Sequence, residues 1–136
     1  MHTLVLYGHS ERAEARLREM ARLARQHGDR LTVLALAQQE PQIFPVKCDT
    51  QRVLWNQILR ELAHEDLARA YMAVDGSDDV ELDVLLCTGQ HPADALAAEA
   101  LTRRADEIVL ADPSHSGLRR RERRRLRRRS PLPVNG

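Results

Sequence analysis

The chain has 136 residues, of which 43% are hydrophobic, and its net charge at neutral pH is +1. That length and apolar content are sufficient for one domain with a buried core, and no stretch approaches the length of a membrane span. The average charge conceals a split. Residues 119–129 hold nine arginines and one glutamate, so the other 125 residues carry a net charge of −7. We therefore expect an acidic body and a basic segment.

The cysteines and the amino terminus indicate a reducing compartment. Cys48 and Cys87 lie far apart and form no CxxC pair, which argues against a zinc ribbon, a redox motif or a disulfide framework. The first ten residues lack the basic segment and the long apolar run of a secretory signal. These features predict a soluble cytoplasmic protein that makes no contact with a membrane.

The amino-terminal part alternates strand-like and helical patterns. Residues 3–7 form a short apolar run, Ser10 is placed to cap a helix that begins at Glu11, and Gly28 is placed to end it. Residues 31–37 are apolar almost throughout, as in a parallel strand that is covered on both faces. The helix is expected to bury Ala13, Leu17, Met20, Ala21 and Ala24.

The middle of the chain is less regular. Residues 38–48 contain two prolines and are predicted to form a loop, after which Asp49 or Thr50 can cap a long helix. The apolar repeat slips near His64, so we expect a kink or two short helices there. The expected core side of this helix carries Leu54, Trp55, Ile58, Leu59 and Leu62.

The carboxyl-terminal part continues the alternation. A turn at 75–77 precedes a third strand at 81–88, and Pro92 suits the first position of a helix. A fourth strand is predicted at 106–111, and residues 131–134 can supply a minimal fifth strand. Strands that alternate with helices predict a doubly wound parallel sheet. The helix that follows Pro92 is expected to turn Leu96, Ala97, Ala100 and Leu101 inward.

The order of these elements resembles the universal stress protein family. The turn TGQHPADAL and the segment ADEIVLADPSHSGLRR, followed by SPLPV, carry the resemblance. It covers nearly the whole of residues 1–136 and is weakest between residues 38 and 80. It implies a single-domain, Rossmann-like α/β fold with a parallel sheet of four to five strands and helices on both faces. It also implies a stress-related or regulatory binding protein that forms a homodimer.

The resemblance bears on nucleotide binding, because some family members bind ATP. Those members place a G-x-x-G pattern after the fourth strand and a further glycine after nine intervening residues, where this chain has Ala111, Ser114 and Arg124. Asp112 adds a negative charge beside the expected phosphate path. We therefore expect a degenerate site and no cofactor. The alternative is a residual site for ATP or AMP, formed by Tyr7, Gly8, His9, Ser10, Ala111, Ser114, Ser116, Gly117 and Arg119.

The arginine-rich segment 119–129 is predicted to be a helix within the same domain, and three interpretations remain open. Its arginine stems can lie along the acidic body while Leu118 and Leu126 anchor it. It can dock on an acidic protein partner. It can also bind nucleic acid nonspecifically through phosphates, since no aromatic residue lies near Arg119–Arg129 to read bases.

Catalytic and metal signatures are weak in this sequence. His9, His91 and His115 each follow a different predicted strand, and we expect solvated loop histidines rather than zinc ligands. No nucleophile triad, GxxxxGK loop or paired-carboxylate pattern stands out, so we predict that the protein is not an enzyme. The ending PLPVNG lacks the apolar extension through which the family often dimerises.

Overall fold

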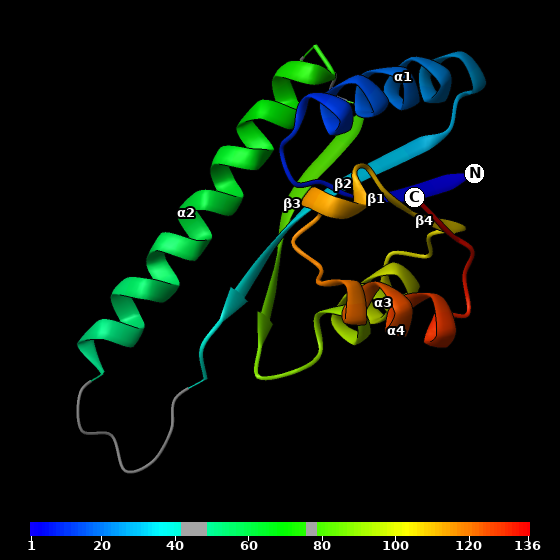
Figure 1. Ribbon diagram of the computed structural model, residues 1–136. Helices are drawn as coiled ribbons and strands as arrows, with labels where there is room; N and C mark the ends of the chain where they lie inside the picture. The colour runs from blue at the N-terminus through cyan, green and yellow to red at the C-terminus, as the bar shows by residue number, and fades with distance from the viewer. Residues whose placement is uncertain (42–48, 76–78) are drawn as a thin grey trace.

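The computed structural model describes residues 1–41, 49–75 and 79–136. In this part of the chain, one parallel sheet has the strand order β3-β2-β1-β4-β5. Helices α1 and α2 cover one face and α3 and α4 cover the other (Figure 1). The predicted doubly wound α/β sheet is confirmed. The strands are β1 (His2–Leu6), β2 (Arg30–Gln39), β3 (Val80–Thr88), β4 (Glu107–Leu110) and β5 (Val134–Asn135); the helices are α1 (Glu11–His27), α2 (Thr50–Ala73), α3 (Pro92–Thr102) and α4 (Arg120–Arg129), with a 3-10 turn η1 (Pro113–His115).

The central strand β1 separates two cores because successive side chains point to opposite faces. Val5 belongs to the core beneath α1 and α2, whereas Leu4 and Leu6 belong to the core beneath α3 and α4. All three side chains are fully buried. This double burial explains why residues 3–7 read as a continuous apolar run rather than as an alternation.

The local signals at both ends of α1 are confirmed. Ser10 Oγ accepts a hydrogen bond of 3.0 Å from the Ala13 backbone N–H, as an N-cap does. Gly28 has a φ of 69°, and its N–H bonds to the carbonyl of Ala24. These two contacts define where the helix begins and ends.

Helix α2 contradicts two predictions. It runs without interruption from Thr50 to Ala73, so the expected kink near His64 is wrong. Asp49 stands at the N-cap but makes no capping bond, because its carboxylate pairs with Arg52. The face that packs on the sheet consists of three alanines, one leucine and one amide: Ala63, Ala70, Ala73, Leu67 and Asn56.

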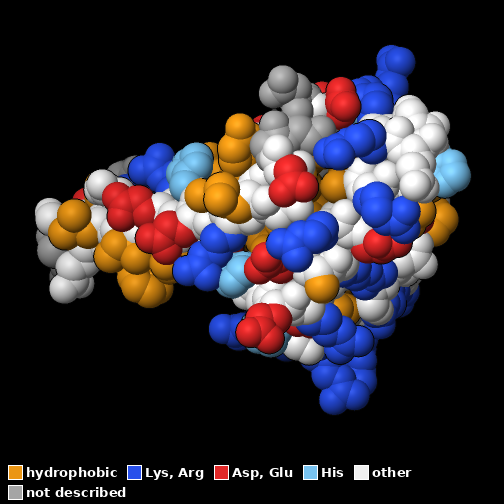
Figure 2. All heavy atoms as spheres, turned by 90° about the horizontal axis from the view of Figure 1, so that it is seen from above, with side chains coloured by type: hydrophobic (Ala, Val, Ile, Leu, Met, Phe, Trp, Pro, Cys, Tyr) orange, Lys and Arg blue, Asp and Glu red, His pale blue; other side chains and the backbone are white. Residues whose placement is uncertain are grey.

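The predicted core side of α2 is also mostly wrong. Its large apolar residues lie outside the core, while alanines let the helix approach the sheet closely. Buried Asn56 replaces apolar packing with two bonds to the backbone of Glu40, of 2.8 and 3.1 Å. Seen from above, hydrophobic side chains emerge among acidic ones on the narrow projection of the molecule (Figure 2). Along the whole of α2, the exposed large apolar residues are Val53, Leu54, Trp55, Ile58, Leu62, Tyr71 and Met72.

Smaller differences concern element boundaries. The predicted loop 38–48 begins late, since Gln38 and Gln39 extend β2, and its residues 42–48 lie outside the described chain. The predicted turn at 75–77 falls largely there too. Leu101, expected to face inward, is 54% exposed. The predicted fifth strand is present, paired in parallel with β4. Among the described helices, none combines the length and hydrophobicity needed to cross a bilayer.

Candidate functional site

The candidate site lies at the carboxyl ends of the parallel strands β1 and β4. Here the order in which successive strands are added to the sheet changes direction. In doubly wound sheets this switch point is the usual ligand crevice. The segments that follow β1 and β4 meet here, because the Ala111 N–H bonds to the carbonyl of Leu6 at 3.1 Å. The structure therefore brings together the two segments, residues 7–10 and 111–119, that the sequence singled out.

Asp112 occupies the centre of this junction. Its carboxylate is only 6% exposed and accepts a 2.8 Å bond from Ser10 Oγ, a 3.2 Å bond from the Ser114 N–H and a 3.0 Å bond from His115 Nδ1. The bond from Ser10 is the largest of the effects that lower the pKa of Asp112. Asp112 is therefore a buried anion whose bonding capacity is satisfied from within the chain.

Gly8 closes the junction from the β1 side. A Cβ atom placed on Gly8 would lie 1.6 Å from the carbonyl oxygen of His115, so the two backbones are in direct contact. Glycine is required here by proximity, since any side chain would displace the loop that follows β4. The contact leaves no crevice between Gly8 and His115.

Two further predicted site residues, Tyr7 and His9, also form hydrogen bonds within the protein. Tyr7 is buried in the core beneath α1 and α2, and burial raises the pKa of its hydroxyl to about 12. That hydroxyl lies 3.0 Å from His9 Nδ1, and the His9 N–H donates to Asp66 of α2 at 3.4 Å. Burial raises the pKa of Asp66. The structure thus places Tyr7, one of the predicted site residues, in the core beneath α1 and α2.

The loop after β4 forms hydrogen bonds within itself. Ser116 is buried, donates to the carbonyl of Pro113 at 3.1 Å and accepts from the Leu118 N–H at 3.3 Å. Arg123 Nη1 donates to the carbonyls of Pro113 and Leu118 at 3.0 and 2.8 Å. A cationic group near the phosphate path is therefore engaged with backbone oxygens. Of the nine predicted site residues, Ser114, Gly117 and Arg119 are exposed, His9 and Ser10 are half-buried, and Tyr7, Gly8, Ala111 and Ser116 are buried.

A pocket of about 460 Å³ lies beside the closed junction, at the carboxyl ends of β2 and β3. Arg119 is the one predicted site residue that lines it. The thiol of Cys87 donates to the carbonyl of Gln90 at 3.1 Å, and burial raises the pKa of this thiol. Sequence reasoning missed the pocket because its walls come from four separate segments. Its other lining residues include Gln38, Gln39, Trp55, Leu59 and Gly89.

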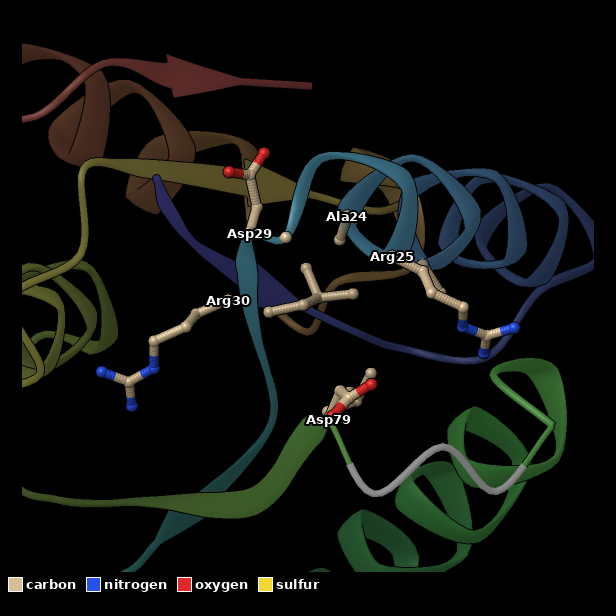
Figure 3. Close-up of a pocket in the computed structure, with 9 residues that line it drawn as sticks. Ala24, Arg25, Asp29, Arg30 and Asp79 are labelled. Carbon is tan, nitrogen blue, oxygen red and sulfur yellow. The ribbon is translucent and has the colours of Figure 1, made fainter.

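A second hollow, of about 280 Å³, lies at the opposite end of the sheet, where β2 and β3 begin. Figure 3 shows Arg25 and Arg30 extending away from it in different directions. Arg30 pairs with Glu81, and Asp29 pairs with the terminal ammonium of Met1. Because the two guanidinium groups do not converge, this hollow is not arranged to hold an anion.

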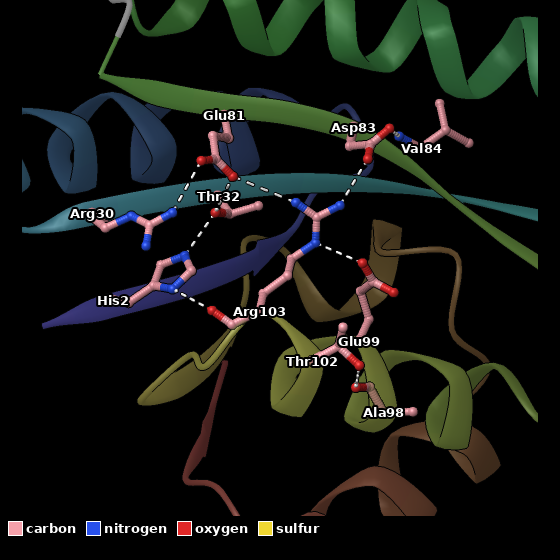
Figure 4. Close-up of polar contacts among 10 residues, drawn as sticks. All are labelled: His2, Arg30, Thr32, Glu81, Asp83, Val84, Ala98, Glu99, Thr102 and Arg103. Carbon is pink, nitrogen blue, oxygen red and sulfur yellow. Dashed lines mark hydrogen bonds and ion pairs between the residues drawn. The ribbon is translucent and has the colours of Figure 1, made fainter.

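Polar contacts at that same end tie the sheet to α3 (Figure 4). Buried His2 lies 2.7 Å from Thr32 Oγ1 through Nε2 and 3.1 Å from the carbonyl of Arg103 through Nδ1. The Arg103 side chain bonds to Glu99 at 2.6 Å and to Asp83 at 2.7 Å. These contacts hold β1, β2, β3 and α3 together and are structural. Nowhere in the described residues do three or more His, Cys, Asp or Glu side chains gather as a metal site would require.

The loop histidines take partners of their own. His91 Nδ1 lies 2.9 Å from Glu122 on α4, and the Glu122 carboxylate also accepts from the Ala93 N–H at 3.2 Å. Glu122 therefore caps α3 from the neighbouring helix. His115 bonds to Asp112, as described above. His91 and His115 are exposed, as predicted, but each also contacts a carboxylate of the protein.

Comparison with known proteins identifies the fold. No protein-family model matches the chain, and no curated protein matches it in sequence. Among solved structures, a protein of the universal stress protein family from Burkholderia pseudomallei superposes with a TM-score of 0.68 at 17% identity, over 98% of this chain and 92% of that one. A universal stress protein from Archaeoglobus fulgidus in complex with dAMP gives 0.62 at 22%, over 98% and 94%. A universal stress protein in complex with cAMP gives 0.54 at 20%, over 98% and 94%.

Proposed function

We propose that this chain, which has the fold of universal stress proteins, is a regulatory binding protein of the stress response whose switch point is closed to nucleoside triphosphates. The observation that supports the proposal is the buried carboxylate of Asp112. It takes the donors of Ser10, Ser114 and His115 that an incoming phosphate would need. The contact between Gly8 and His115 removes the space as well.

Electrostatics favours the same conclusion. A triphosphate entering the junction would meet the carboxylate of Asp112 at short range in a poorly solvated site, where like charges repel strongly. Arg123 of α4, which bonds to the loop after β4, is already held by two carbonyls. The protein would act through binding, without catalysis and without a bound triphosphate, and its cytoplasmic location is part of this proposal.

The pocket beside β2 and β3 favours a second candidate function, the binding of an adenine monophosphate. Arg119 supplies one guanidinium, which suits a single phosphate, and Trp55 supplies an aromatic ring for stacking. Two proteins of the same fold were crystallised with dAMP and with cAMP. In this chain the nucleotide would lie one strand away from the closed junction.

Calorimetric titration with ATP and AMP, at moderate and at high salt, separates the two candidates. We expect no saturable ATP binding at high salt. Saturable AMP binding that is lost in Arg119→Gln and kept in Arg121→Gln would support the second candidate, since Arg119 lines the pocket and Arg121 does not. Tight ATP binding that survives high salt would contradict closure of the switch point.

We further propose a homodimer that uses the exposed apolar side of α2. β5 has only two residues and offers little edge for pairing, whereas Ile58 and Leu62 are 45% and 50% exposed on a helix with an apolar outer side. Light scattering should give twice the mass of one chain. Ile58→Glu should give the mass of one chain, while Leu23→Glu, at a 40% exposed leucine of α1, should remain dimeric. A monomeric parent protein would contradict the dimer.

A further inference from the structure

The helix α4 presents a row of arginines that the acidic body does not neutralise. Arg120, Arg124 and Arg128 follow one another at intervals of four residues, and Arg121 lies beside them on the same outer side. All four are exposed, and no hydrogen bond or ion pair within the described residues engages their side chains. We call this row, Arg120, Arg121, Arg124 and Arg128, the arginine face.

On the opposite side of α4, the nearby acidic side chains Asp94 and Glu122 are already paired within the protein. Arg125 makes a two-pronged pair with Asp94 of α3, at 3.0 and 2.9 Å, and this pairing lowers the pKa of Asp94. Glu122 points inward to His91 and to the Ala93 N–H. Leu126 is fully buried against the core. The interpretation that the arginine stems lie along an acidic body therefore applies to Arg125 and fails for the arginine face.

The arginine face is unfavourable in the isolated molecule. Like charges at i and i+4 on a helix repel one another, and here two such pairs, Arg120 with Arg124 and Arg124 with Arg128, follow in series. The anchoring contacts of Leu126, Arg125 and Glu122 keep the helix formed in spite of this repulsion. An external polyanion would remove the repulsion and gain charge-assisted hydrogen bonds, because the guanidinium fork matches a phosphate group.

We propose that the arginine face binds the phosphate backbone of double-stranded nucleic acid, independently of its sequence. Guanidinium groups recur about every 6 Å along the helix. A duplex offers a phosphate about every 3.4 Å along each strand, which is dense enough for each guanidinium to pair with a different phosphate. The arginine face carries no aromatic or amide side chain, and its guanidinium groups are assigned to phosphates, which carry no sequence information, so the proposed contact is nonspecific.

Other polyanionic surfaces fit the arginine face less well. A membrane-bound amphipathic helix buries an apolar side in the lipid interface, whereas both leucines flanking or within α4, Leu118 and Leu126, are buried in the protein core. An acidic protein carries fewer charges per length than a duplex and releases no condensed counterions. The net charge of −7 outside residues 119–129 repels the phosphates of a duplex. The contact between the protein and the duplex should therefore be confined to α4.

The test is fluorescence anisotropy with two labelled 20-base-pair duplexes of unrelated sequence, titrated with the full chain over a range of salt. We expect similar affinities for both duplexes and a slope of log K against log salt of about −3.6, for about four neutralised phosphates. The triple variant Arg120→Gln, Arg124→Gln, Arg128→Gln should lose at least about 10-fold in affinity, with the slope reduced by about 2.7.

A matched control removes the same charge elsewhere. Arg12→Gln, Arg25→Gln, Arg60→Gln alters three exposed arginines of α1 and α2 and should change the affinity by less than about 2-fold. The triple Arg→Lys variant at 120, 124 and 128 keeps the charge and should retain most of the slope. Circular dichroism checks that every variant is folded.

Three results would overturn the proposal. Equal losses in the two glutamine triples would mean that only the net charge matters. Unchanged binding in the triple variant of the arginine face would locate the contact elsewhere. Displacement of the duplex by polyglutamate at equal charge concentration would reassign the arginine face to an acidic protein. Failure of nucleotide binding in the calorimetric titration leaves this inference unaffected, because the arginine face lies at neither the switch point nor the pocket that Arg119 lines.

Discussion

The loop after β4 and the helix α4 are adjacent in sequence, yet they treat charge in opposite ways. In the loop, one carboxylate, Asp112, is buried and accepts three bonds from the protein itself. On α4, the four arginines of the arginine face are exposed and unpaired within the described chain. The switch point, where doubly wound sheets usually bind ligands, is thus filled by an internal anion, while cationic groups remain available outside. An anionic partner should therefore meet α4 and not the switch point.

The largest effect is expected from opening the loop. In Gly8→Ala the new methyl group would collide with the carbonyl of His115, and backbone atoms cannot yield as a flexible side chain can. We expect a loss of at least about 3 kcal/mol in unfolding free energy, measured by urea denaturation. Gly28→Ala is the control, since its methyl group would contact nothing and only the positive φ is unfavourable, at about 1 kcal/mol. Equal losses would mean that the loop is not packed against β1.

The next effect concerns the internal anion. Asp112→Asn weakens the charge-assisted bonds from Ser10 and Ser114 and should reduce the unfolding free energy by about 2 kcal/mol near neutral pH. The folded pKa of Asp112 is lowered, so its contribution is complete above the unfolded value of 3.8 and is lost as the pH falls through the folded pKa. The difference between parent and variant should therefore shrink below about pH 4. A pH-independent difference would contradict a charged, bonded Asp112.

A smaller effect tests the inward side of α4. Glu122→Gln weakens the bonds to His91 and to the first turn of α3, so we expect a loss of about 1 kcal/mol. Thermal denaturation of Glu11→Gln, an exposed acid in the first turn of α1, serves as the comparison and should show a smaller change. Equal changes would mean that Glu122 does not cap α3.

The smallest effect has the opposite sign. Arg124→Gln relieves repulsion with Arg120 and Arg128, so the variant should be more stable than the parent by about 0.3 kcal/mol at low salt. The gain should vanish in 1 M salt, where the Debye length is about 3 Å. Arg60→Gln, whose neighbours at four residues are Asn56 and His64, should give no such salt-dependent gain. A loss of stability in Arg124→Gln would show that the arginine face has internal partners.

The predictions that held rest on local physical signals. Ser10 and Gly28 mark the ends of α1 through bonds to residues three or four positions away, so their roles are legible in the sequence. The predicted strands succeeded because both faces of the central sheet are buried and leave long apolar runs. The prediction of the inward side of α2 was wrong because the helix carries more large apolar residues, most of them exposed, than the alanines that pack on the sheet. Hydrophobicity alone does not reveal which side of a helix a sheet accepts.

The candidate site shows the same limit. The sequence predicted a site in the segments that follow β1 and β4, which the structure brings side by side, and it marked Asp112 as a charge near the expected phosphate path. It did not reveal that Asp112 is buried, because its partner Ser10 lies 102 positions away and the contact exists only after β1 and β4 are side by side. The pocket beside β3 was missed for a similar reason, since Arg119 and Trp55 come from elements that meet only in the folded chain.

The sequence by itself determined the order of strands and helices, the caps of α1 and the concentration of arginines in one short helix. These features depend on neighbouring residues and on composition. The tertiary structure decided which charges are satisfied, because hydrogen bonding and burial depend on distances between segments remote in sequence. It directs Asp112 and Glu122 inward to partners and leaves Arg120, Arg124 and Arg128 in solvent. That division of charges, and not the number of arginines, defines the surfaces on which this protein can act.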